Sequence, residues 1–213
     1  MKNKIFLLLC LFAFVQFSSR AQSAIALSQK SVDMNVFGLK LGEALTIPEC
    51  DVEKFLGKYQ YKFSTNKTCF QHLKVDLKNL NQLVPQNETL RIEFEYSDAP
   101  SLVSSRAVLV SIIDGKLEGL GFNTRGLQNQ DVVLEKLKDK YGEPSALIKD
   151  VVQNRLGAKF DTFNAMWKLP NLNILFQSIT YGLDSGLVNI NTDKGEAAQQ
   201  KALKELNQDK RPL

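Results

Sequence analysis

The fold is decided by residues 106–144, which read RAVLVSIIDGKLEGLGFNTRGLQNQDVVLEKLKDKYGEP. Ala107 to Ile113 is an apolar, β-branched run, and Lys116 to Thr124 is a second run of strand type. The dipeptide Asp114-Gly115 lies between them and is typical of a tight turn. This stretch therefore predicts a β-hairpin.

A helix is predicted directly after the hairpin, from Gln130 to Tyr141. Apolar residues recur there three and four positions apart, which gives a helix one apolar face, formed by Val132, Val133, Leu134, Leu137 and Tyr141. Gly142 and Pro144 then stop the helix. The local signals agree on a strand-strand-helix unit.

Further strands are predicted on both sides of this unit. Leu90 to Tyr96 alternates apolar and charged residues, so one face of this predicted strand should be exposed to solvent. Four more strand candidates follow the helix with short connections: Ala146 to Val152, Phe163 to Leu169, Leu172 to Ile179 and Leu187 to Ile190. The expected fold class is α+β: an antiparallel sheet, largely a meander, with the helix packed across one face.

The N-terminal segment carries weaker patterns. Val32 to Leu41 predicts one strand with a bend or bulge at Gly38, and Asp51 to Tyr61 has apolar residues at helical spacing, with a strand as the competing interpretation from Tyr59 onward. We expect a single domain over residues 22–193, with two lobes divided near Asn79 to Thr89 as the alternative. Residues 194–213 read as a polar C-terminal helical tail with a thin apolar stripe.

Residues 1–21 read as a secretory signal peptide. Lys2 and Lys4 form a positive start, Ile5 to Phe17 is almost unbroken apolar sequence, and Ser19-Arg20-Ala21 offers small residues for cleavage. The apolar run is shorter than the roughly 20 residues that span a bilayer, so we expect no stable membrane insertion after cleavage near Ala21. The expected location is the periplasm or the exterior of the cell.

The mature chain is nearly neutral. Cleavage removes Lys2, Lys4 and Arg20 from the 27 basic side chains and leaves 24 against 23 acidic ones. Basic residues do not cluster with aromatic residues, so a nucleic-acid partner has little electrostatic support.

Cleavage also leaves two cysteines, Cys50 and Cys69. An even number of thiols in an exported chain predicts a disulfide, and only one pairing exists. The alternative, a redox or metal pair, is disfavoured because the spacing is far from Cys-x-x-Cys. The expected bridge makes the N-terminal part of the domain a disulfide-containing segment.

His72 is the single histidine, and it follows Cys69 by three positions. A metal site needs further ligands, and an oxidised Cys69 cannot supply one, so we expect a surface or half-buried histidine beside the disulfide. A Ser-His-Asp or Cys-His system has to use His72, yet the sequence has no Gly-x-Ser-x-Gly elbow. We therefore assign no catalytic, metal-binding or cofactor-binding residue.

Glu93 and Glu95 share one face of a predicted strand, about 7 Å apart by strand geometry, near the separation that glycosidases use. Alternating charges on a wet strand face have this spacing automatically, so a structural role is the simpler interpretation. Trp167 is expected in the core, with exposure as an interface anchor the functional alternative. Trp167, Glu93 and Glu95 are therefore the candidate interface residues.

Two segments resemble parts of small bacterial exported modules. They are residues 37–45, FGLKLGEAL, and the unit Val133-x3-Leu137-x2-Lys140-Tyr141-Gly142-x-Pro144. They are similar to segments of the SmpA-like envelope proteins and of the β-lactamase-inhibitor-like fold. The resemblance implies an exported α+β module, and it carries over no functional residue. The chain departs from it where Pro48-Glu49-Cys50 interrupts the first unit and where the helix follows a hairpin.

The expected function is that of a non-enzymatic protein-binding module, of inhibitor, immunity or envelope-assembly type, with a protein partner in the envelope or outside the cell. A small-ligand or lipid carrier is one alternative. A hydrolase with a carboxylate mechanism through Glu93, Glu95 or Asp98 is another.

Overall fold

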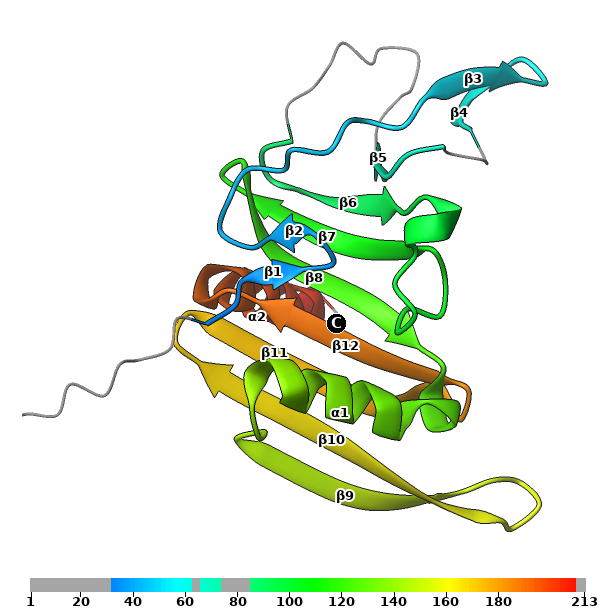
Figure 1. Ribbon diagram of the computed structural model, residues 1–213, viewed down its shortest axis with the longest axis vertical. Helices are drawn as coiled ribbons and strands as arrows, with labels where there is room; N and C mark the ends of the chain where they lie inside the picture. The colour runs from blue at the N-terminus through cyan, green and yellow to red at the C-terminus, as the bar shows by residue number, and fades with distance from the viewer. Residues whose placement is uncertain (1–31, 63–65, 74–84, 210–213) are drawn as a thin grey trace, which may run out of the picture. The chain divides into compact units, whose positions relative to one another are not determined.

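The computed structural model describes residues 32–62, 66–73 and 85–209 (Figure 1). Its centre is an eight-stranded antiparallel sheet in the order β5-β6-β7-β8-β12-β11-β10-β9. The strands of this sheet are β5 (Cys69–His72), β6 (Glu88–Glu93), β7 (Ala107–Ile113), β8 (Lys116–Thr124), β9 (Ala146–Gln153), β10 (Lys159–Leu169), β11 (Leu172–Gly182) and β12 (Ser185–Asn191). The fold is α+β, as the sequence predicts.

The predicted hairpin is present with its predicted bounds, as β7 and β8. Asp114 and Gly115 have φ of 50° and 74°, the left-handed values that a two-residue hairpin turn of type I′ requires. The register shifts after Ser111, which pairs with Gly119 while Ile112 pairs with Leu117. Glu118 is therefore the extra residue of a β-bulge.

Helix α1 (Gln130–Tyr141) also has its predicted bounds and packs on one face of the sheet, which we call the core face (Figure 1). Val133, Leu134 and Leu137 are buried against it, whereas Val132 lies outside the buried stripe and is 56% exposed. Gly142 ends the helix with φ of 82°, and its N–H donates to the carbonyl oxygen of Lys138.

The four strands after α1 form the predicted antiparallel meander. β9 pairs with β10, β10 with β11, and β11 with β12. β12 then pairs with β8, which joins the meander to the central hairpin. One continuous hydrophobic core therefore runs across both halves of the sheet.

Helix α2 (Asp193–Asp209) covers the opposite face, which we call the α2 face; Figure 1 shows α1 in front of the sheet and α2 behind it. Thr192 caps this helix, because its hydroxyl accepts the N–H of Gly195 at 3.1 Å and also donates to the buried carboxylate of Glu118. The tail that the sequence predicts is thus a helix anchored at its N-terminal end. Leu203 and Leu206, further along, are 46% and 58% exposed.

The N-terminal segment corrects two predictions. The single bent strand expected from Val32 to Leu41 is a small hairpin, β1 (Asn35–Val36) and β2 (Leu39–Lys40). Phe37 and Gly38 form its turn with φ of 55° and 81°. The Asn35 side chain accepts the N–H of Gly38 at 2.9 Å, which favours the turn over a continuous strand.

The helical interpretation of Asp51 to Tyr61 is also wrong. These residues form a hairpin, β3 (Val52–Phe55) and β4 (Lys58–Tyr61). Leu56 and Gly57 make its turn with φ of 48° and 80°, a conformation that ends a right-handed helix.

The strand expected from Leu90 to Tyr96 is shorter at its C-terminal end. β6 ends at Glu93, and Tyr96 lies in a short 3-10 helix, η2 (Tyr96–Asp98), where it is 83% exposed. A turn begins at Glu95, whose carbonyl oxygen accepts the N–H of Asp98 at 3.0 Å. A second 3-10 turn, η3 (Gly126–Gln128), precedes α1.

The signal peptide predicted for residues 1–21 and most of the loop predicted from Asn79 to Thr89 lie outside the described residues. Within the described ranges, no helix is both long and apolar enough to cross a membrane.

Candidate functional site

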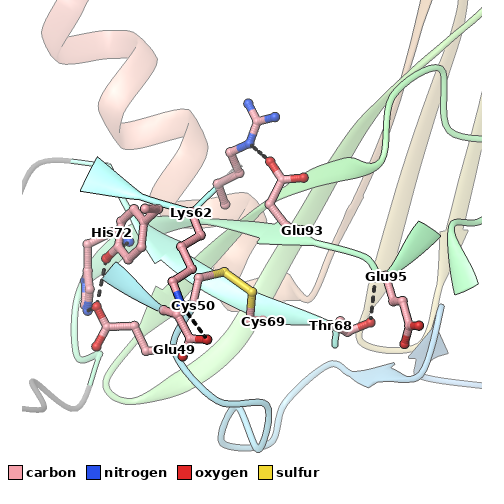
Figure 2. The surroundings of a disulfide bond; sticks show 11 residues. Glu49, Cys50, Lys62, Thr68, Cys69, His72, Glu93 and Glu95 are labelled. Carbon is pink, nitrogen blue, oxygen red and sulfur yellow. Dashed lines mark hydrogen bonds and ion pairs between the residues drawn. A yellow bond between two sulfur atoms is a disulfide. The ribbon is translucent and has the colours of Figure 1, made fainter. Parts of the chain in front are cut away.

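The two edges of the large sheet differ in how they end. At one edge, residues 48–50 run beside β5: the N–H of Cys50 donates to the carbonyl oxygen of Phe70, and the N–H of Phe70 donates to that of Pro48. The predicted disulfide between Cys50 and Cys69 is present and joins this segment to β5 (Figure 2). This edge is therefore covered, and the bridge indicates an oxidising compartment outside the cytosol.

The other edge is strand β9, which is the last strand in the order (Figure 1). β9 pairs along its whole length with β10, and within the described residues no strand pairs with its outer side. Leu147, Ile148 and Val151 expose 39%, 55% and 55% of their surface. An apolar, regular and open edge is the usual template on which a further strand pairs.

The backbone of β9 alternates between its two sides. The N–H of Asn154 donates to the carbonyl oxygen of Ala158 at the end of the hairpin, and the carbonyl of Asp150 accepts the hydroxyl of Thr162. Because antiparallel pairing alternates along a strand, even-numbered residues of β9 direct their N–H and C=O groups toward β10. The same groups of Leu147, Lys149 and Val151 then point to the open side.

The side chains of β9 alternate between the two faces of the sheet. Leu147 lies opposite the buried Ala165, and Lys149 lies opposite Phe163, which packs against the core. Leu147, Lys149 and Val151 are therefore on the core face, whereas Ile148 and Asp150 are on the α2 face. Met166, 38% exposed, extends the apolar surface around Ile148 onto β10.

Two charged side chains interrupt this apolar strand, Lys149 and Asp150. Charges at an edge restrict indiscriminate pairing. The carboxylate of Asp150 also accepts the N–H of Val151 at 2.7 Å. Asp150 thus occupies one of the donors that an added strand needs.

A second candidate site is a groove of about 700 Å³ on the α2 face, between α2 and strands β6, β7, β8 and β12. Its floor includes Gly121, where a Cβ atom would lie 2.7 Å from the side-chain oxygen of Asn189. The lining combines apolar side chains with hydrogen-bonding groups, among them Ala107, Leu109, Leu187, Ser111, Asn123, Asn189 and Asn191, and it includes the charged residues Glu88 and Arg91. β11 and β10 separate this groove from the open edge.

The predicted interface residues are not brought together. Trp167 is 1% exposed, and its indole Nε1 donates to the carbonyl oxygen of Gly142 at 2.7 Å, so it lies in the core and offers no surface to a partner. The carboxylate of Glu93 accepts Arg91 Nε at 2.5 Å, and the N–H of Glu95 donates to the hydroxyl of Thr68 (Figure 2).

His72 is more buried than a surface or half-buried residue, because its side chain has no exposed area. Its Nδ1 lies 2.7 Å from a carboxylate oxygen of Glu88, and its backbone N–H donates to the hydroxyl of Tyr61. That hydroxyl donates in turn to Glu49 at 2.8 Å, and burial raises the pKa of Tyr61. These contacts join β4, β5 and β6 beside the disulfide.

The surroundings of His72 were compared with those of a metal site. Across residues 32–62, 66–73 and 85–209, no group of three or more His, Cys, Asp or Glu residues could hold a metal ion. The chemistry visible around His72 is a set of hydrogen bonds that hold the covered edge.

The open edge was not identified from the sequence, although the strand itself was. Strand order depends on pairings between distant segments, which a hydropathy pattern does not specify. The available signal was Lys149-Asp150 in the middle of an apolar strand, a pattern typical of edge strands.

Comparison of the chain with models of protein families, with curated proteins and with solved structures found no match.

Proposed function

We propose that this chain is a non-enzymatic protein-binding domain, exported to the periplasm or beyond the cell, that pairs an extended segment of a partner protein with the outer side of β9. The observation that carries this proposal is the contrast between the two edges. One edge is covered by a disulfide-linked segment, and the other exposes apolar side chains on a regular eight-residue strand.

Strand addition suits the chemistry of β9. Main-chain hydrogen bonds to Leu147, Lys149 and Val151 would supply affinity, and the alternating side chains would supply specificity. An exported protein with an open apolar edge risks aggregation unless a partner covers that edge. The proposed location is supported by the N-terminal sequence pattern together with the disulfide.

A carboxylate-dependent hydrolase receives less support from the contacts around its candidate residues. Glu93 is ion-paired with Arg91, and Glu95 is placed in a turn after β6 ends. The only histidine is enclosed among Glu88, Tyr61 and the sheet edge.

The experiment that tests the proposal selects short random peptides from a displayed library on the mature, oxidised protein. Binding of enriched peptides is then compared between the wild type and Lys149→Pro. The N–H of Lys149 points to the open side, so proline there removes a donor for the partner and spares the ladder with β10.

We expect Lys149→Pro to weaken peptide binding by about tenfold, which corresponds to the loss of one hydrogen bond. Leu109→Asp is the matched control for binding in the groove under α2, where Leu109 is 48% exposed. Loss of binding in Leu109→Asp with full binding in Lys149→Pro would place the peptide in the groove and refute the proposal.

The groove under α2 supports a second candidate function, the binding of a small ligand. Its volume lies in the range of ligand pockets, and amide and hydroxyl groups line an apolar floor. Native mass spectrometry of freshly isolated protein should then show a co-purifying molecule that is absent from Leu109→Asp. Identical spectra without added mass would refute this second function.

A further inference from the structure

We infer that the partner segment runs antiparallel to β9 and places a basic residue opposite Asp150, then an acidic residue opposite Lys149, with apolar residues on both sides. This inference rests on the proposed function and adds the chemistry of the partner. It follows from three features of β9: the contact between Asp150 and Val151, the charge on each face, and the like-charge contacts that a second copy would create.

The first feature is the carboxylate of Asp150, which accepts the N–H of Val151 at 2.7 Å. An added strand has to take over that N–H, because Val151 directs its backbone groups to the open side. A basic side chain opposite Asp150 draws the carboxylate away and gives it a new partner. With a neutral or acidic residue opposite, the N–H of Val151 could bond to the added strand only if the carboxylate of Asp150 lost its hydrogen-bond donor without gaining a new one.

The second feature is the order of charges along the strand. Side chains directly opposite each other in an antiparallel pair share one face, and opposite charges there are favourable while like charges are unfavourable. Lys149 on the core face therefore selects an acidic residue, and Asp150 on the α2 face selects a basic one. The partner is expected to run antiparallel, because every strand pairing in the eight-stranded sheet is antiparallel and parallel pairing is slightly less stable. Read from N- to C-terminus, the basic residue of such a partner comes first.

The apolar side chains fix the flanking positions. Val151 and Leu147 on the core face, and Ile148 on the α2 face, are 55%, 39% and 55% exposed. Apolar residues opposite them bury this surface. The central residues of the partner segment, read from N- to C-terminus, are thus apolar, basic, acidic and apolar.

The third feature disfavours a second copy of this chain as the occupant. Two copies paired antiparallel through β9 are related by a two-fold axis perpendicular to the sheet, so opposed residues must lie on the same face. The two registers centred on the strand then place Lys149 opposite Lys149 or Asp150 opposite Asp150. Each register has like charges at its centre, which favours a different protein as partner.

The test uses two synthetic peptides of the same composition. The matched peptide has the core Val-Val-Arg-Glu-Val-Val, and the swapped peptide has Val-Val-Glu-Arg-Val-Val. We expect the matched peptide to bind the mature protein about tenfold more tightly, because two charge pairs change from attraction to repulsion. Equal binding, or tighter binding of the swapped peptide, would overturn the inference.

The double variant Lys149→Glu with Asp150→Lys should reverse the preference. An unreversed preference would also overturn the inference. Failure of the inference is distinguishable from failure of the proposed function. If library-selected peptides bind Lys149→Pro more weakly than the wild type, strand addition to β9 is still supported. If they bind both proteins equally well, strand addition itself is refuted.

Sedimentation velocity tests whether two copies of this chain pair through β9. The wild type should remain monomeric, and Lys149→Val should dimerise, because the register centred on residue 149 then opposes valine to valine and Leu147 to Val151. Lys168→Val, at an exposed position of the neighbouring β10, is the matched control and should stay monomeric. A dimeric wild type, or a monomeric Lys149→Val, would overturn the account of self-exclusion.

Discussion

Removal of the disulfide should lower the free energy of unfolding by an amount that follows from the structure. Cys50 and Cys69 are separated by 19 residues, and closing a loop of this length stabilises a protein by about 3 kcal/mol in the chain-entropy model. Both cysteines are buried, with 3% and 0% exposed, so replacing them with alanine also removes packed sulfur, which costs roughly 1 kcal/mol for each one. The variant Cys50→Ala with Cys69→Ala should therefore lose about 5 kcal/mol.

The assay is equilibrium unfolding in urea, followed by tryptophan fluorescence, for the oxidised wild type, the double variant and the reduced wild type. The reduced wild type separates the two contributions, because it loses the cross-link but keeps its sulfur atoms. We expect a loss of about 3 kcal/mol on reduction alone. If the free energies of unfolding of all three proteins lay within about 1 kcal/mol of one another, the bridge would not stabilise the β5 edge.

Further predictions concern α2 and the core. Gly195→Ala adds a Cβ that overlaps a carbonyl oxygen of β8, so a strain of about 1–3 kcal/mol should outweigh the roughly 1 kcal/mol gain in helix propensity. We therefore expect α2 to be cleaved faster by a protease in this variant than in the wild type. An unchanged rate of cleavage would contradict the prediction. Lys194 lies 2.7 Å from Asp114 and lowers the pKa of that carboxyl below its usual value, so the pair should stabilise the fold above about pH 4 and lose its effect as pH falls through the lowered pKa. Thermal unfolding at a series of pH values should therefore show a weaker acid dependence in Asp114→Asn, and identical curves would refute the coupling. Trp167→Phe removes the hydrogen bond to Gly142 and should cost about 1–3 kcal/mol in urea unfolding followed by circular dichroism, whereas a cost near zero would show that the bond is dispensable.

The central part of the fold could be predicted because its signals are local. Asp114-Gly115 fixes a turn of known geometry, and the apolar spacing from Gln130 to Tyr141 fits only a helix, so both elements have the predicted bounds. The pairing of Cys50 with Cys69 could be predicted by counting, since these are the two cysteines outside the predicted signal peptide.

The N-terminal segment could not be predicted as well, because its turns use residues with little turn preference. Phe37 and Leu56 adopt left-handed φ values, and such residues rarely signal a turn on their own. The ring of Phe37 packs against the ring of Phe122, with 5.1 Å between the ring centroids, a tertiary contact that the local sequence does not reveal.

The candidate site was harder to predict from the sequence, because it depends on the order of the strands in the assembled sheet. Ala146 to Val152 was predicted as a strand, yet only the order of all eight strands makes β9 an edge. Trp167 illustrates the opposite case: a large aromatic residue is a good interface candidate by type, and the structure places it in the core.

The most direct measurement is amide hydrogen exchange by NMR on the mature protein, alone and saturated with the matched peptide. Strand addition to β9 predicts new protection at the amides of Leu147, Lys149 and Val151, which face the open side, and little change at Ile148, which faces β10. That alternation is the signature of a strand added to β9. New protection confined to the groove residues Leu109 and Leu187, with β9 unchanged, would contradict the claim that the open edge binds the partner.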